Sequence, residues 1–534
     1  KVYVEMVNEI ALNRENDYEN ATRQSLLNEN KSEKKDIYKK FTAPKKIGLT
    51  KKLIFSLASA VIGSAFQFGY NTGVINAPGE LIRQFINESH ISRYGSELSA
   101  STVGSLLAFT VAVFAVGGCI GGLLNGFCAD FFGRKKSLLL NNLLGILGAL
   151  FMGFSKYANS YEMIIIGRFI IGLNCGLNSG LCPMYLNELS PVDIRGSVGA
   201  LFQLGVTSTI MLSQILGLPE ILGTEDLWPL LLGITGLFSI IQLLTLPFCP
   251  ESPRFLLINK DLPAEAETAL MALRGTKDIK HEIDDMKNEA EMQRSQPKFT
   301  IFSLFSTRAL LLPTVISIVL HLSQQLSGIN AVFYYSNDIL NKSGIENSQY
   351  ATPFIGLIMV IMTLVSIPLM EKSGRRFLHL LGLGGMFVFS IFMTIAFVLQ
   401  SKYDWLKYLS IVSMMLFIVF FAIGPGSIPW MMVAELFSQG PRSAAVSLAV
   451  LVNWSANVAV GQGFPPLFEN VTKNWTFLLF AVFLAVFWVF TFAFLPETKN
   501  KKAEEITAYF QDKKNLFAFK ANTNLSDAVE DFNI

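Results

Sequence analysis

Long apolar stretches alternate with short polar ones along most of the chain. Between Leu53 and Pro496, twelve stretches contain no Asp, Glu, Lys or Arg, and each approaches or exceeds the roughly 20 residues that a helix needs to cross a bilayer. Lipid offers no partner for exposed backbone groups, so helices are the expected form. The pattern predicts an all-α membrane protein with twelve transmembrane helices. The stretches are residues 53–79, 98–129, 137–155, 169–187, 196–219, 227–250, 309–337, 347–370, 377–401, 408–434, 443–468 and 474–496.

Basic residues at the ends of these stretches predict the orientation of the chain. By the positive-inside rule, their positions put both termini in the cytoplasm. Asn87, in the sequence Asn-Glu-Ser, then falls in the longest outside loop and is a predicted glycosylation site. The basic groups are Lys45, Lys46, Lys51 and Lys52 before the first stretch, Arg134, Lys135 and Lys136 after the second, Arg375 and Arg376 after the eighth, and Lys499, Lys501 and Lys502 after the twelfth.

The composition of the chain is that of a membrane protein. Of the 534 residues, 51% are hydrophobic and 16% are charged. The apolar composition makes the lipid bilayer the expected surroundings, and the net charge of +2 gives no indication of nucleic-acid binding. All five cysteines lie in apolar stretches, and we expect no structural disulfide.

The distribution of charge divides the chain into five parts. Residues 1–50 are polar and are predicted to be a disordered cytoplasmic tail. Residues 51–250 and 309–496 are predicted to be two six-helix bundles. Residues 251–308 form a charged cytoplasmic linker with helices expected over 264–273 and 279–292. Residues 497–534 are the predicted cytoplasmic C-terminal tail.

Charged motifs recur in the two halves at a nearly constant offset. The second and eighth stretches are each followed by an acidic residue, two further residues and then Gly-Arg. Glu and Arg flank the loops after the fourth and tenth stretches. Such regular spacing indicates duplication. Two repeated six-helix halves are typical of an alternating-access transporter, which holds its substrate between them. The matching positions are Asp130 and Glu371, 241 residues apart, Glu188 and Glu435, 247 apart, and Pro250 and Pro496, 246 apart.

The seventh stretch carries the candidate chemistry. Its middle reads HLSQQLSGINAVFYY over residues 321–335, with several amides where a lipid-spanning helix would have Leu or Val. A carboxamide both donates and accepts hydrogen bonds, so it can bind a neutral polar ligand without burying a charge. Amides also bond one membrane helix to another, and this structural role remains the alternative for each of them.

These motifs, together with PESPR, PETK and GPGSIPWMMVAELFSQGPR, resemble the sugar-porter branch of the major facilitator superfamily, and in particular its class I facilitative glucose transporters. The resemblance covers about residues 50 to 510. It implies passive D-glucose uniport across the plasma membrane by alternating access, with no cofactor and no enzymatic activity. It also implies cytoplasmic latches made of Asp130, Arg134, Glu188, Arg195, Glu251, Arg254, Glu371, Arg375, Glu435 and Arg442.

The same resemblance implies a sugar site between the halves. An indole can pack on a pyranose ring, and Phe421 would form a wall of the pocket. Tyr334 and Tyr335 match the outer gate of the family, and Asn453 matches a polar residue of the pathway, with ordinary packing as the alternative for these three. The implied sugar contacts are Gln203, Gln324, Gln325, Asn330, Trp430 and Asn457.

Three positions depart from the family pattern. Met359 stands where the family usually has a sugar-binding Asn, Ala422 replaces an acid, and His321 replaces the first residue of a QLS tripeptide associated with glucose over fructose. His321 is interpreted as a helix-packing residue, a sugar contact or a titrating group. We therefore expect glucose transport with appreciable galactose transport and leave fructose open.

Two other functions remain as alternatives to uniport. Proton-coupled relatives resemble one another in an Asp of the first span that faces an Arg of the fourth, whereas here the positions are Asn71 and Arg168. Asn71 cannot titrate, which favours passive transport over proton symport. A sugar sensor would be expected to carry a long cytoplasmic signalling domain. No span carries a ladder of charges, so a channel is disfavoured.

Overall fold

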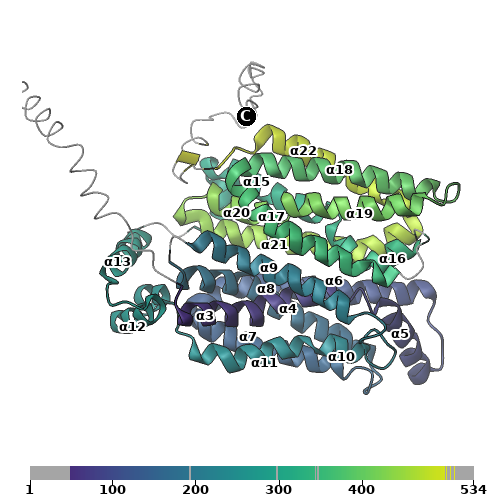
Figure 1. Ribbon diagram of the computed structural model, residues 1–534, viewed down its shortest axis with the longest axis horizontal. Helices are drawn as coiled ribbons and strands as arrows, with labels where there is room; N and C mark the ends of the chain where they lie inside the picture. Colours follow the sequence, from purple (N-terminus) through teal and green to yellow (C-terminus); the bar gives the residue numbers. More distant parts are fainter. Residues whose placement is uncertain are drawn as a thin grey trace, which may run out of the picture. The chain divides into compact units, whose positions relative to one another are not determined.

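The computed structural model describes residues 49–191, 194–295, 299–342, 344, 348–499, 501, 505–506 and 510. Within these residues, twelve helices are long and apolar enough to cross a membrane (Figure 1). The predicted all-α membrane fold with twelve spans is confirmed. The predicted N-terminal tail lies outside the described residues except for its last two positions, and so does most of the predicted C-terminal tail.

The first six spans contain two that are not uniform α-helices. The first span changes to a π-helical turn in its middle, and the sixth is interrupted at Ile234. In order, these spans are α3 (Lys51–Ala60), the π-turn (Val61–Ala65) and α4 (Phe66–Gly73); α6 (Ala100–Phe131); α7 (Arg134–Gly153); α8 (Tyr161–Leu189); α9 (Arg195–Leu216); and α10 (Trp228–Gly233), α11 (Thr235–Thr245) and a 3₁₀ turn (Leu246–Phe248). An additional helix, α5 (Gly79–Tyr94), follows the first span.

Three further helices connect the halves. A π-helical turn (Phe255–Asn259) leads to α12 (Pro263–Arg274), α13 (Lys280–Ser295) and α14 (Ile301–Ser306), so both predicted linker helices are present. Pro263 opens α12 and Gly275, with φ of 67°, closes it, as expected for these residue types. Arg274 attaches the linker to the bundle, because its Nη1 donates to the carbonyl of Leu189 at 2.8 Å.

The last six spans also contain two interrupted helices, the seventh and the tenth. The spans are α15 (Arg308–Gln325) and α16 (Ile329–Lys342); a 3₁₀ turn (Ser348–Tyr350) and α17 (Thr352–Ser373); α18 (Arg375–Leu399); α19 (Leu406–Ile423) and α20 (Ile428–Leu436); α21 (Gln439–Pro466) with a π-turn (Leu467–Val471); and a 3₁₀ turn (Lys473–Trp475) with α22 (Thr476–Phe494).

Glycines explain both interruptions. Gly328 has φ of +90°, a conformation that only glycine adopts readily, and it separates α15 from α16. The sequence Gly424-Pro425-Gly426 separates α19 from α20, because Pro425 cannot donate to the preceding helical turn. A broken helix leaves carbonyls without helical partners, and inside a membrane protein such groups are tolerated where other polar groups satisfy them.

The halves meet along two pairs of helices. α6 packs against α21 and α9 packs against α17, while α4 contacts α16 near the end of the bundle that carries α5. Small residues allow the close approach of α6 and α21: a Cβ at Gly118 would lie 2.5 Å from the ring of Trp454, and one at Gly122 would lie 2.4 Å from Val450. Figure 1 shows α5 at the opposite end of the bundle from α12 and α13, and we call these the α5 end and the linker end.

Candidate functional site

The predicted amides gather where the seventh span is broken. Gln324 and Gln325 end α15, and Asn330 lies in the first turn of α16. All three side chains are buried. The break at Gly328 lets both groups of amides face the same region, because the two helices no longer follow one continuous helical surface.

Gln324 connects the two broken spans. Its Nε2 donates to the carbonyls of Pro425 and Gly426 at 2.8 Å each, which are groups that the break between α19 and α20 leaves free. Its Oε1 accepts from Nδ2 of Asn453 at 2.6 Å. Gln324 thus satisfies backbone carbonyls that would otherwise be buried without partners.

Asn453 of α21 is at the centre of the cluster. Its Oδ1 accepts from Nε2 of Gln325 at 3.0 Å, while its own Nδ2 donates to Gln324. Asn330 donates to Oε1 of Gln325. We call Gln324, Gln325, Asn330 and Asn453 the amide cluster. Hydrogen bonds connect these four uncharged side chains, which come from α15, α16 and α21.

The two predicted gate tyrosines lie beyond this cluster toward the α5 end. Tyr334 donates to Oδ1 of Asn457 at 3.1 Å, and Tyr335 donates to the carbonyl of Gly461 at 2.9 Å. The ring of Tyr335 stacks on Phe464, with centroids 5.5 Å apart. Both tyrosines therefore hold α16 against α21 in this structure.

The two predicted aromatic residues of the site lie on α19 and α20, on either side of the break in the tenth span. Phe421 is buried and meets Phe333 edge to face, with centroids 6.3 Å apart. Trp430, in the first turn of α20, is 38% exposed and packs edge to face on His321 at 4.9 Å. His321 is fully buried, and its Nδ1 bonds the carbonyl of Ser317 at 2.9 Å. The buried His321 ring therefore packs against the indole of Trp430.

Gln203 is the one predicted sugar contact that lies in the other half. It is in α9, is partly buried, and its side chain makes no hydrogen bond to the part of the chain that the structure describes. Met359 and Ala422, the two apolar replacements, are both buried within the same hydrophobic core as Phe421. Alanine has no polar side-chain atom, and the thioether sulfur of methionine is only a weak hydrogen-bond acceptor.

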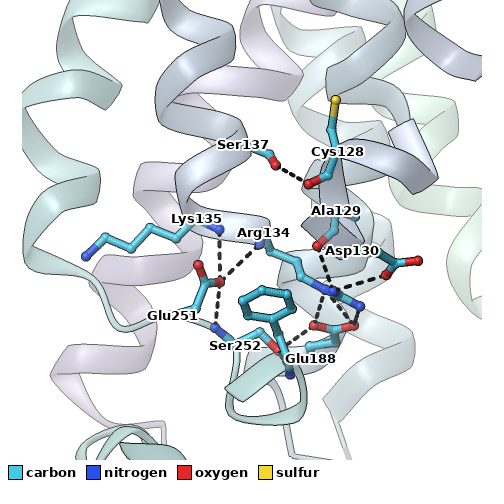
Figure 2. A network of polar contacts seen from close by, with 10 residues as sticks. Cys128, Ala129, Asp130, Arg134, Lys135, Ser137, Glu188, Glu251 and Ser252 are labelled. Carbon is cyan, nitrogen blue, oxygen red and sulfur yellow. Dashed lines mark hydrogen bonds and ion pairs between the residues drawn. The ribbon is translucent and has the colours of Figure 1, made fainter. Parts of the chain in front are cut away.

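The charged motifs of the first half form a compact network at the linker end (Figure 2). Arg134 donates to Glu188 from Nε at 2.9 Å and from Nη2 at 3.0 Å, and Asp130 lies 3.6 Å from Nη1. Glu251 accepts from the backbone N–H groups of Arg134 and Lys135 at 3.2 and 3.0 Å. A carboxylate at the N-terminus of α7 satisfies otherwise free N–H groups and is favoured by the helix dipole.

The second half repeats this network. Arg375 donates from Nε to Glu435 at 3.2 Å, and Glu497 accepts from the backbone N–H groups of Arg375 and Arg376 at 3.0 and 3.1 Å. Gly133 and Gly374, with φ of 95° and 83°, turn the chain into α7 and α18. The three-dimensional match agrees with the repeat found in the sequence.

The other predicted latch residues have different partners. Arg195 donates to the carbonyl of Ser190 at 3.2 Å, and Arg442 donates to that of Phe437 at 3.2 Å, so each bonds the chain five residues before it. Burial lowers the pKa of Arg254 from its ordinary value. Glu371 lies in the last turn of α17, and its side chain is outside the described set.

Arg168 is buried in the first half without a carboxylate. Its Nη1 donates to the carbonyl of Asn71 at 2.8 Å, and its guanidinium lies 4.4 Å from the ring centroid of Phe114. No ion pair joins Arg168 to an acidic residue among the described positions.

Some residues of these networks were not predicted. Glu497 was not predicted as part of the second network, although its offset of 246 residues from Glu251 could have identified it. The carbonyls of Pro425 and Gly426 are backbone groups, so no side chain in the sequence could have identified them.

The predicted glycosylation site, Asn87, lies in α5, where its Oδ1 accepts from the backbone N–H of Leu98 at 3.1 Å.

Comparison with known proteins agrees with this architecture. The model of the family "Sugar (and other) transporter" matches residues 57–510. A facilitated glucose transporter member 3 from Ovis aries is 50% identical over 87% of this chain and 93% of its own length. A member 1 from Gallus gallus is 47% identical over 87% and 94%.

Solved structures give the same result. The inward open conformation of the xylose transporter XylE from E. coli has a TM-score of 0.71 at 26% identity and covers 86% of this chain and 99% of its own. XylE described as a proton:xylose symporter and bound to 6-bromo-6-deoxy-D-glucose has a TM-score of 0.70 at 25% identity, over 86% and 99%. With its twelve spans, repeated charge networks and broken helices, the chain belongs to the sugar transporter family of the major facilitator superfamily.

Proposed function

We propose that the protein is a facilitative hexose transporter that carries D-glucose passively by alternating access. The observation that carries the proposal is the amide cluster at the break of the seventh span. It offers donors and acceptors without a formal charge, which suits a neutral polyhydroxylated ligand. Neutral hydrogen bonds exchanged with water give modest affinity, as a carrier that must release its sugar requires. The relatives named facilitated glucose transporters support glucose as the substrate.

The proposed binding residues extend from this cluster. Gln324, Gln325, Asn330 and Asn457 would contact hydroxyls, Trp430 would pack on the sugar ring, and Gln203 would complete the site from the first half. Phe421 would form a wall, and Tyr334 and Tyr335 would close the outer side. Amides that bond one another in this structure can exchange these partners for hydroxyls at little net cost.

The repeated charge networks are the proposed cytoplasmic gate. In each network an arginine at the N-terminus of one span binds a glutamate at the end of the next span. Each network therefore holds together helix ends of a single half. The basic residues of the linker end support its location in the cytoplasm together with both termini. Residence in the plasma membrane, galactose as a second substrate and a glycan on Asn87 are parts of the same proposal.

The chemistry around Arg168 supports uniport over proton symport. Coupled transport needs a group that takes up and releases a proton during the cycle. Asn71 occupies the position that faces Arg168, and it offers only an amide side chain and the carbonyl that Arg168 binds. The proton:xylose symporter among the related structures makes symport the alternative that an experiment must exclude.

Uptake by the purified protein in proteoliposomes tests the proposal. Radiolabelled D-glucose should enter until its inside and outside concentrations are equal, with or without an inward proton gradient. Asn71→Gln is a control that keeps the residue uncharged. Accumulation above the outside concentration under a proton gradient would establish symport, whereas binding of glucose without uptake would establish a sensor.

A further inference from the structure

An ion pair at the α5 end joins the two halves of the transporter. Arg83 of α5 donates from Nη2 to Oδ2 of Asp338 at 2.8 Å and from Nη1 to Oδ1 at 3.3 Å, and Asp338 belongs to α16. The two parallel bonds form the bidentate geometry that makes arginine–carboxylate pairs directional. The residues are 255 positions apart in the sequence.

A group of amide bonds lies beside this ion pair and also joins the halves. Asn76, just after α4, donates to the hydroxyl of Ser336 at 2.8 Å and accepts from the backbone N–H of Asn337 at 3.2 Å. Nδ2 of Asn337 donates back to the carbonyl of Asn76 at 3.3 Å. The α5 end is therefore closed by consecutive residues of α16 that bind the first half.

Arg83 is fixed to the first half. Its Nη1 also bonds Glu80, one turn earlier in α5, at 2.9 Å. A second ion pair, between Arg93 and Glu162 at 3.0 Å, attaches α5 to α8 within the same half. Burial lowers the pKa of Arg83, but the hydrogen bond and charge of Asp338, followed by those of Glu80, raise it above its ordinary value. Arginine is protonated at physiological pH in any case, so the guanidinium carries its charge whether the two halves are together or apart.

Alternating access requires the α5 end to open once in each cycle, with the two halves moving apart about the site between them. Arg83 and Asp338 then separate, because they belong to different halves. We propose that the Arg83–Asp338 pair is an outer latch that holds the α5 end closed and shifts the resting carrier toward the state open at the linker end. Its role rests on the alternating-access mechanism of the proposed function and not on the identity of the sugar.

The expected strength of this latch follows from its exposure. The side chains of Arg83 and Asp338 are 21% and 35% exposed, so water screens their attraction partly. Pairs of this kind contribute up to about 1 kcal/mol, which corresponds to a change of roughly two- to fivefold in the ratio of closed to open molecules.

Distances between the halves test the latch without any sugar. Spin labels at Tyr157→Cys and Tyr403→Cys, both exposed near the α5 end, report its width after Cys119 and Cys128 are replaced by Ala. Asp338→Asn should lower the ratio of molecules that show the short distance to molecules that show the long distance by about two- to fivefold.

Arg83→Gln should have the same effect as Asp338→Asn, and the double variant should show no further fall, since either change removes the pair. The matched control is Glu162→Gln, which breaks an ion pair of similar exposure inside one half, and it should leave the ratio unchanged. Unchanged distances in both single variants, or an equal change in the control, would overturn the latch. Failure of glucose uptake in the unmodified protein would instead refute the proposed function and leave these distances interpretable.

Discussion

Replacing Gln325 by leucine separates a binding role of the amide cluster from a merely structural one. Gln325 is buried, donates to Asn453 at 3.0 Å and accepts from Asn330. Leucine has a similar length and fills much of the same space, but it neither donates nor accepts. The change therefore removes hydrogen bonds with little change in volume.

The magnitude follows from the partners that remain. Oδ1 of Asn453 and Nδ2 of Asn330 each lose the partner that Gln325 supplied. A buried polar group without a partner costs about 1–3 kcal/mol. A bound hexose would lose at least one amide contact as well, so kcat/KM for glucose should fall by roughly tenfold or more.

The assay compares uptake and stability in the same preparations. Initial rates of labelled glucose uptake at low concentration give kcat/KM per molecule at the membrane, and thermal unfolding gives Tm. Because stability alone could reduce uptake, both measurements are needed. The expected result is a large rise in KM together with a moderate fall in Tm.

Gln242→Leu provides the matched control. Gln242 of α11 is also buried, donates to Ser64 at 3.1 Å and accepts from Asn142 at 2.9 Å, but it lies in the first half and not at the breaks of the seventh and tenth spans. Its loss should lower Tm by a similar amount and leave KM unchanged. If Gln325→Leu also lowers Tm while KM stays at the wild-type value, the amide is structural and the proposed binding role is wrong.

Three further predictions follow from the same structure. Met359→Asn should sharpen the preference for glucose over its epimers in competition uptake, because an amide can pair a hydroxyl that methionine cannot; an unchanged competition profile would show that residue 359 does not face the sugar. Trp430→Phe should weaken uptake severalfold through loss of the indole N–H and ring area, and equal uptake would argue against stacking. Arg375→Gln should loosen its network with Glu435 and change the ratio of influx to efflux rates, whereas equal changes in both directions would exclude a gating role.

The sequence by itself determined the spans, the repeat and the helix break at Gly424-Pro425-Gly426, whereas the break at Gly328 was not predicted. The predicted features depend on local properties: the length of an apolar stretch, the backbone freedom of glycine and the absence of an N–H in proline. The periodic placement of charge likewise needs no knowledge of contacts. For the same reason, both linker helices could be predicted from their prolines, acids and apolar spacing.

Only the tertiary structure decided which polar groups bind one another. Asn453 joins Gln324 and Gln325 across 129 and 128 residues of sequence, and Arg83 finds Asp338 across 255. A buried donor binds whichever acceptor the packing of helices brings within about 3 Å, and that choice depends on the whole bundle rather than on neighbouring residues. Sequence patterns therefore located the polar residues, whereas packing of the two halves fixed their partners.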